Sequence, residues 1–344
     1  MKKCCFLVPY FGKLPNYFNL FLKTCSYNQD YEWKIFTDDN VIRDLPKNVE
    51  IIKMTFDNFV SKARKKFNFE ISLKEPYKLC DFKPAYGYIL EEYIPYEKYM
   101  FWGHCDLDIL IGNLNHFFSN EILDTYDKIL CLGHMILYKN NYENNRTFMS
   151  RIGELELYKE AFSVERITAF DETYYKGKNV NTIFDYNNKK IFTKDLSLNF
   201  QIFPTKFVKV SFDFEKYLFV SEKNSYQYVY TWENGEINRY HIENNELVKE
   251  EFLYMHFQSR KMILKEELLK NASTINIIPN YFLPLGFPNV TKENFDKICK
   301  KKICFHYLEV HFNRKKKRII KFFKRERKNV NKGINKKNCK TRKI

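Results

Sequence analysis

Apolar runs alternate with amphipathic segments through the first third of the chain. Residues 4–8 form a continuous apolar run that Pro9 ends, a pattern typical of a central parallel strand buried on both faces. The other elements predicted in this region are strands at 33–37 and 49–54 and helices at 16–22 and 56–67. This β-α-β-β-α order predicts an α/β fold built in layers.

The strongest chemical signal is an aromatic strand within residues 99–112 that ends on two acids. Asp106 and Asp108 are one residue apart, and in an extended chain alternate side chains share a face, so both carboxylates can point one way while Leu107 points into the core. Two hard oxygen ligands suit Mg²⁺ or Mn²⁺, and these ions usually keep positions for water or substrate phosphates. An isolated pair of this kind can also be a solvated acidic turn, so residues elsewhere in the chain have to distinguish a metal site from such a turn.

Aromatic and polar residues follow the first two predicted strands, at the edge where open α/β sheets bind ligands. Tyr10 and Phe11 follow the first strand, where they can stack on a base or plug the top of the core. Thr37 ends the second strand, and Asp38, Asp39 and Asn40 follow it. We expect these polar groups to face a base or a ribose.

A third candidate lies just before Pro84, which is suited to the first position of a helix because it lacks an N–H and disfavours helical geometry at Lys83. The free amides of Ala85 and Tyr86 would then join the Lys83 ammonium at a helix start, and such a site favours phosphate. A surface lysine beside a helix cap is the alternative interpretation.

Strands and long polar loops alternate further along the chain. The pattern predicts strands at 128–132 and 135–138, an exposed polar loop or lid at 140–151, and a hairpin at 232–240. Asp171 and Glu172 stand side by side in this part of the chain. Either acid can act as a base or hold a sugar hydroxyl, and a solvated loop is the alternative.

An apolar run at residues 252–257 delivers His256, and Arg260 and Lys261 stand just beyond it. A lone histidine on an apolar strand is usually a hydrogen-bonded core residue. The adjacent cations favour a site here, because a metal-bound diphosphate needs both a further ligand and compensating positive charge.

The formal net charge of +16 is concentrated at the end of the chain. Residues 312–344 contain 16 Lys and Arg residues and one acid, so the body, residues 1–311, is nearly neutral and lacks the basic stripe of a nucleic-acid-binding protein. The tail interleaves cations with Ile319, Ile320, Phe322 and Phe323, which predicts contact with an anionic membrane surface. Nine cysteines and no secretory signal predict reduced thiols in a cytoplasmic protein, peripheral on the inner face of the cell membrane.

These segments resemble a bacterial glycosyltransferase family found among capsule and lipopolysaccharide biosynthesis proteins, which is related to GT-A transferases with an Asp-x-Asp motif. The resemblance spans residues 4–265. The segments that carry it are 9–12, 36–39, 76–87, 101–108, 132–134, 170–172 and 256–262.

The resemblance implies a single GT-A-like domain, residues 1–311, with a Rossmann-like mixed sheet flanked by helices, followed by the basic tail. It implies a nucleoside-diphosphate sugar donor, for which we expect a UDP-sugar, bound through Mn²⁺ or Mg²⁺, and a glycan or lipid-linked acceptor. Asp106 would lie near the ribose and the metal, Asp108 would ligate the metal, and His256 would complete the ligands. Asp81 and Lys83 would hold the donor sugar and phosphate, although more distant transferases space this pair more widely, which leaves open which of the two touches the donor.

Cleavage of the donor leaves a diphosphate with growing negative charge. The metal, Lys83 and Lys261 would stabilise that charge, and Asp171 or Glu172 would deprotonate the acceptor hydroxyl if the enzyme inverts. Two alternatives come from other classes: a metal-dependent phosphohydrolase or nuclease using the same acidic pair, and a nucleic-acid or anion-binding protein acting through its basic tail.

Overall fold

The computed structural model describes residues 1–299 apart from 41–43, 174, 204, 224–225, 259 and 272, together with 312, 315 and 316. The chain forms two units, Met1–Ile298 and Cys299–Ile344, and the first contains every element discussed below. The predicted membrane contact of the tail lies outside the described residues. No helix in the described part of the chain combines the length and apolar character needed to cross a membrane.

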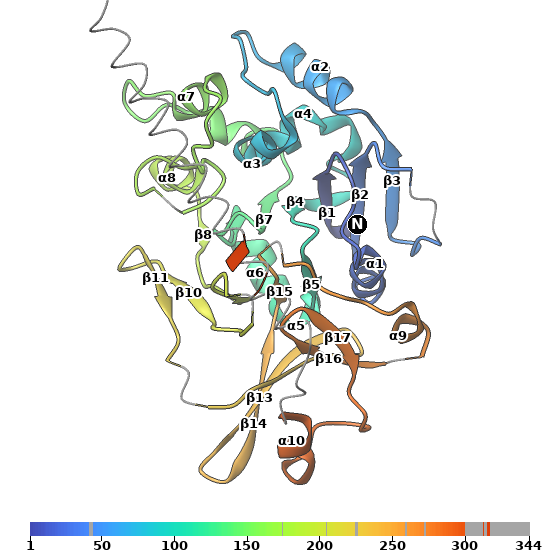
Figure 1. Ribbon diagram of the computed structural model, residues 1–344. Helices are drawn as coiled ribbons and strands as arrows, with labels where there is room; N and C mark the ends of the chain where they lie inside the picture. Colours follow the sequence, from blue (N-terminus) through green and yellow to red (C-terminus); the bar gives the residue numbers. More distant parts are fainter. Residues whose placement is uncertain are drawn as a thin grey trace, which may run out of the picture. The chain divides into compact units, whose positions relative to one another are not determined.

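The main sheet has seven strands in the order β3-β2-β1-β4-β7-β6-β8 (Figure 1). The strands are β1 (Lys2–Pro9), β2 (Tyr31–Thr37), β3 (Val49–Lys53), β4 (Tyr99–Cys105), β6 (Lys128–Ile129), β7 (Met135–Lys139) and β8 (Ile191–Phe192). Strands β3, β2, β1 and β4 are parallel, and β7 runs antiparallel to β4. The prediction of a mixed α/β sheet is therefore confirmed.

Helices cover both faces of this sheet. The helices of the first unit are α1 (Phe18–Ser26), α2 (Phe56–Lys66), α3 (Leu79–Phe82), α4 (Tyr86–Ile89), α5 (Leu114–Phe117), α6 (Asn120–Thr125), α7 (Leu157–Ser163), α8 (Val180–Tyr186) and α9 (Glu266–Asn271), and α10 (Lys292–Cys299) ends at the boundary between the units. Alternate residues of β1 face opposite layers: Leu7 packs with residues of α2 and α4, whereas Phe6 and Val8 pack with residues of α1. Since β1 is buried on both faces, the interpretation of residues 4–8 as a central strand is confirmed.

The order of the parallel strands reverses at β1. The chain passes from β1 to β2 and β3 on one side and then returns to β4 on the other side of β1. At such a switch point the connections leave in opposite directions, and ligands bind outside the carboxyl ends of the two central strands. Tyr10 follows β1 and Asp106 follows β4, so both stand at the carboxyl ends of these two central strands.

Three further sheets lie in the described part of this unit. A three-stranded sheet has the order β5-β15-β9, from β5 (Ile109–Ile111), β15 (Tyr254–His256) and β9 (Ser197–Asn199). A five-stranded antiparallel sheet contains β12 (Val229–Glu233), β13 (Glu236–Glu243), β14 (Glu246–Phe252), β16 (Thr274–Ile278) and β17 (Tyr281–Pro284), and β10 (Val210–Asp213) pairs with β11 (Leu218–Ser221). Asn234 and Gly235 join β12 to β13 with positive φ angles of 48° and 96°, as two-residue hairpin turns require, so the predicted hairpin is confirmed.

Two local predictions are wrong. Residues 76–89 form a nearly unbroken series of short helical turns, so Lys83 has helical angles (φ −49°, ψ −43°) and the Tyr86 N–H donates to the Lys83 carbonyl. No free helix start exists there. The polar segment 140–151 is not an exposed loop either: its 3₁₀ helix, Asn144–Met149, packs inward, and the buried Asn145 accepts a hydrogen bond from Trp102 Nε1 at 2.8 Å.

Candidate functional site

The acidic pair occupies the short turn between β4 and β5. The Asp106 N–H donates to the His134 carbonyl at 3.0 Å, and the Asp108 carbonyl accepts the Phe257 N–H at 2.9 Å. Leu107, between them, is buried in the core as predicted. Backbone hydrogen bonds to two distant segments thus hold the turn, while the two carboxylates remain partly exposed.

The three-stranded sheet brings His256 to this turn. In its register His256 lies opposite Ile109, the residue after Asp108. The His256 Nε2 atom is 3.3 Å from Asp108 Oδ1, and ligand atoms of Asp106, Asp108 and His256 all lie within 4.8 Å of one another. Two carboxylates and an imidazole fit a divalent cation such as Mn²⁺ or Mg²⁺ with positions left for a substrate. The structure therefore brings the three predicted ligands together.

Lys83 forms an ion pair with Asp106, the first acid of the pair. Its Nζ atom donates to Asp106 Oδ1 and to the Gly133 carbonyl, each at 2.7 Å, and lies 3.5 Å from Asp171 Oδ2. Burial lowers the pKa of Lys83, but the carboxylates of Asp106 and Asp171 raise it by more, so the ammonium stays charged. Since its donors already face protein oxygens, Lys83 orients Asp106 here and does not offer a phosphate site at a helix start, which corrects that prediction.

Asp171 lies behind Lys83 with 3% of its surface exposed, so the solvated-loop interpretation is wrong for this residue. Burial raises the pKa of Asp171 to about 8, against the lowering effect of Lys83, and burial also raises the pKa of Glu172. A Cβ atom at Gly133 would lie 2.5 Å from Asp171 Oδ2, so only glycine leaves room for this carboxyl group.

We predict that Asp171 makes the protein less stable as pH rises. Because the pKa of Asp171 is raised to about 8 in the folded state and is about 3.9 in an unfolded chain, the unfolded state releases this proton first, and the free energy of unfolding falls between about pH 4 and pH 8. Urea unfolding of wild type and Asp171→Asn across this range measures the effect. The variant should show the shallower decline, and parallel curves would contradict the prediction.

Asp81 is fully buried and does not reach the acidic pair. Its carboxylate accepts hydrogen bonds from Lys78 Nζ at 2.7 Å and from the N–H groups of Thr168 and Phe170 at 3.0 Å each. The expectation that Asp81 holds the donor sugar is therefore corrected: Asp81 anchors the segment that leads to Asp171.

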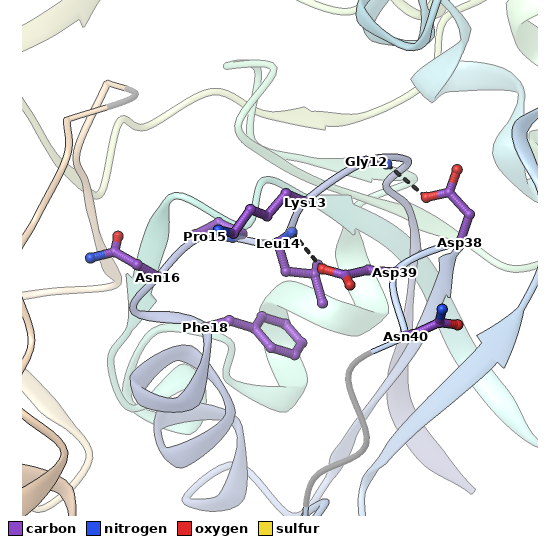
Figure 2. A pocket seen from close by; sticks show the side chains of 9 residues that line it. All are labelled: Gly12, Lys13, Leu14, Pro15, Asn16, Phe18, Asp38, Asp39 and Asn40. Carbon is purple, nitrogen blue, oxygen red and sulfur yellow. Dashed lines mark hydrogen bonds between the residues drawn. The ribbon is translucent and has the colours of Figure 1, made fainter.

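A pocket of about 490 Å³ opens beside the ends of β1 and β2 (Figure 2). Its lining residues are Gly12, Lys13, Leu14, Pro15, Asn16, Phe18, Asp38, Asp39 and Asn40. Asp38 accepts the Gly12 N–H at 2.7 Å and Asp39 accepts the Leu14 N–H at 3.0 Å, so the two acids shape the loop that forms one wall (Figure 2). The structure thus places Asp38, one of the predicted nucleoside contacts, in a pocket.

The other strand-end candidates divide into two groups. Tyr10 is half-buried, and its hydroxyl donates to the carbonyl of Lys13, a pocket residue, at 3.3 Å. Burial and then the charges of Asp108 and Asp39 raise its pKa. Phe11 is buried between Phe56 and Phe59, with ring centroids 5.5 and 5.9 Å away. The core interpretation is therefore right for Phe11, and stacking on a base is wrong.

Thr37 and Arg260 have structural partners. Thr37 is fully buried and its hydroxyl accepts the Asp39 N–H at 3.2 Å, so it shapes the pocket from behind. The buried Arg260 guanidinium donates to the carbonyls of Gln201, Phe203 and Phe257, and burial lowers its pKa to about 10. Arg260 thus fastens a loop and does not contact a diphosphate in this arrangement, whereas Lys261 is exposed.

Residues 6–286 match a family of unknown function, DUF6625. The chain belongs to the DUF6625 family. No curated protein matches this DUF6625 chain.

Two similar solved structures are of LgtC. One is an active-site mutant, with 11% identity, a TM-score of 0.33, and coverage of 58% of this chain and 74% of that chain. The other is the galactosyltransferase LgtC in complex with donor and acceptor sugar analogs, with 11% identity, a TM-score of 0.32, and coverage of 58% and 75%. At this identity and TM-score the likeness says nothing of substrate or reaction.

Sequence reasoning missed two residues at the site of this DUF6625 chain. The His134 ring lies on the His256 ring with centroids 4.3 Å apart, and its Nδ1 atom is 2.6 Å from the Tyr254 hydroxyl. Asn199 contacts the other side of His256 through Nδ1 at 3.1 Å. His134 lies in segment 132–134, one of those that carry the family resemblance, but no role was assigned to it, and no local pattern marks Asn199.

A second group of metal-ligand types, His116, Glu236 and Glu251, also lies within 4.8 Å in the described part of the chain. It differs from the first group because His116 is exposed, whereas His256 is buried. His116 and Glu251 form one ion pair at 2.9 Å, and Lys249 and Glu236 form another at 2.9 Å. We interpret it as a surface ion-pair network.

Proposed function

We propose that this protein is a metal-dependent glycosyltransferase that moves a sugar from a nucleoside-diphosphate sugar to a glycan or lipid-linked acceptor. The observation that supports the proposal most is the convergence of Asp106, Asp108 and His256 within 4.8 Å at the carboxyl end of β4. Tyr10 follows β1, and its hydroxyl donates to the carbonyl of Lys13, which lines the pocket beside β1 and β2. A nucleoside in the pocket and a diphosphate at the cluster would fit one donor molecule.

Each part of the site has a role in this proposal. Asp106, Asp108 and His256 would hold Mn²⁺ or Mg²⁺, which supplies Lewis-acid stabilisation of the diphosphate leaving group. Lys83 fixes the direction of the Asp106 carboxylate. In an inverting reaction Asp171 or Glu172 would take the proton from the acceptor hydroxyl. Burial raises the pKa of both carboxyl groups, and Glu172 is the more exposed of the two.

A two-metal phosphohydrolase fits the same residues less well. Such enzymes hold two cations about 3.5–4 Å apart between carboxylates. Here the ammonium of Lys83 lies between Asp106 and Asp171, where it supplies the positive charge itself. We therefore favour a single-metal transferase. We also retain two further proposals, a role in cell-surface polysaccharide synthesis and membrane contact by residues 312–344.

The products of donor breakdown test the proposal. With Mn²⁺ and no acceptor, we expect slow release of free sugar and nucleoside diphosphate from a matching donor such as a UDP-sugar, because water replaces the acceptor. A phosphohydrolase cleaving the diphosphate would instead release nucleoside monophosphate and sugar phosphate. Chromatography of the nucleotides separates these outcomes, and monophosphate as the only nucleotide product would contradict a transferase.

A further inference from the structure

The side chain of Asn199 faces three hydrogen-bond partners next to the acidic pair. Asn199 ends β9 and lies in register with His256 on the parallel neighbour β15, with 3% of its surface exposed. Its Oδ1 atom is 3.1 Å from His256 Nδ1, 2.8 Å from Gln258 Nε2 and 3.0 Å from the Phe200 backbone N. One carbonyl oxygen therefore gathers all three contacts.

These contacts determine which nitrogen of His256 carries the proton. A backbone N–H can only donate, so the Asn199 atom facing Phe200 is the amide oxygen and the orientation of the amide is not ambiguous. An amide oxygen can only accept, so His256 Nδ1 must bear a hydrogen. In the neutral ring the lone pair then lies on Nε2, the atom 3.3 Å from Asp108 Oδ1. A carboxylate oxygen also can only accept, so this tautomer points two lone pairs at the same space, which suits a cation between them.

Two neighbours hold this arrangement in place. Gln258 has a φ of +54°, a left-handed backbone conformation that residues other than glycine rarely adopt. Its side-chain amide donates a hydrogen bond to Asn199 Oδ1. The His134 ring lies on the His256 ring with an interplanar angle of 31°.

We infer that Asn199, assisted by Gln258, is a positioning residue that keeps His256 in the Nδ1-protonated form and so presents Nε2 to the metal centre. The metal centre itself rests on the proposed function, whereas the choice of tautomer does not. Outer partners of metal-binding histidines fix ring orientation and raise ligand basicity in this way.

The tautomer is measured directly by nitrogen-15 spectra of the histidine rings, recorded without metal at about pH 9, where imidazoles are neutral. His256→Gln assigns the signal. We expect the proton of His256 on Nδ1 in wild type and a mixture of both tautomers in Asn199→Leu. A wild-type proton on Nε2, or an unchanged tautomer in Asn199→Leu, would overturn the inference.

Mn²⁺ titrations followed by electron paramagnetic resonance measure the consequence. Asn199→Leu should bind Mn²⁺ about 10–100-fold more weakly, whereas Asn199→Asp, which keeps an acceptor, should stay near wild type. Asn276→Leu, the same change at a buried asparagine of β16, controls for a general loss of packing. Equal Mn²⁺ affinity in Asn199→Leu and wild type would overturn the inference. If wild type binds no Mn²⁺, the proposed function fails, and the tautomer still decides the role of Asn199.

Discussion

Asp108→Asn should abolish Mn²⁺-dependent binding of nucleoside diphosphate while leaving the fold intact. The amide keeps the size of the side chain but loses its charge and one ligand oxygen. Removing a residue that hydrogen-bonds to a metal ligand weakens metal affinity about 10–100-fold. We therefore expect the loss of a direct ligand to weaken Mn²⁺ affinity by more than about 100-fold. The fold should survive because the turn is held by the backbone bonds of Asp106 to His134 and Phe257 to Asp108, which the substitution does not touch.

Calorimetry with UDP, with and without Mn²⁺, measures this effect. Asp185→Asn, the same substitution at an exposed position of α8, serves as the matched control and should bind as wild type does. The melting temperatures of all three proteins should agree closely. Mn²⁺-dependent binding by Asp108→Asn would remove Asp108 from the set of metal ligands.

Lys78→Met should lower the free energy of unfolding strongly, whereas Asp108→Asn should leave it unchanged. Lys78 and Asp81 are 1% and 0% exposed, and Lys78 Nζ lies 2.7 Å from Asp81 Oδ2. Removing one partner of a buried ion pair leaves an uncompensated charge and costs about 3–5 kcal/mol of unfolding free energy. Because Asp81 also receives the N–H groups of Thr168 and Phe170, the segment leading to Asp171 should loosen as well.

Urea unfolding measures the free energy of unfolding of Lys78→Met and of a variant that loses a surface ion pair. Lys74→Met removes the partner of Glu165 in a pair that is exposed on both sides, and it should leave stability unchanged. Adding Asp81→Asn to Lys78→Met should restore part of the lost stability, since the buried group is then neutral. Equal decreases in the free energy of unfolding of Lys78→Met and Lys74→Met would show that the buried ion pair stabilises the fold no more than the exposed one does.

The structure brings together those candidate site residues whose positions follow from strand ends. Asp106 and Asp108 were predicted as ligands because they follow an apolar strand, and His256 because it ends another. The carboxyl end of a strand at a switch point is a fixed place in an open α/β sheet, so a local pattern is enough to locate such groups. The structure then shows how His256 reaches Asp108, through pairing of β15 with β5.

The predictions that failed concern side chains whose partners are distant in sequence. Phe11 follows a strand end as Tyr10 does, but it packs on α2. Arg260 stands beside Lys261, yet its donors are taken by carbonyls of residues 201–203. The local sequence around a single cationic or aromatic residue does not show whether its side chain contacts a ligand or a distant part of the chain.

The sequence by itself determined the class of fold, the central strand β1, the β12–β13 hairpin and the acids at the end of β4, because each depends on the periodicity or turn chemistry of neighbouring residues. Only the tertiary structure decided that Asp81 is buried beneath the site, that Lys83 links Asp106 to Asp171, and that Asn199 meets His256. Each of these pairs joins residues brought together by packing or by strand register, and register depends on contacts along whole strands, which no short pattern specifies.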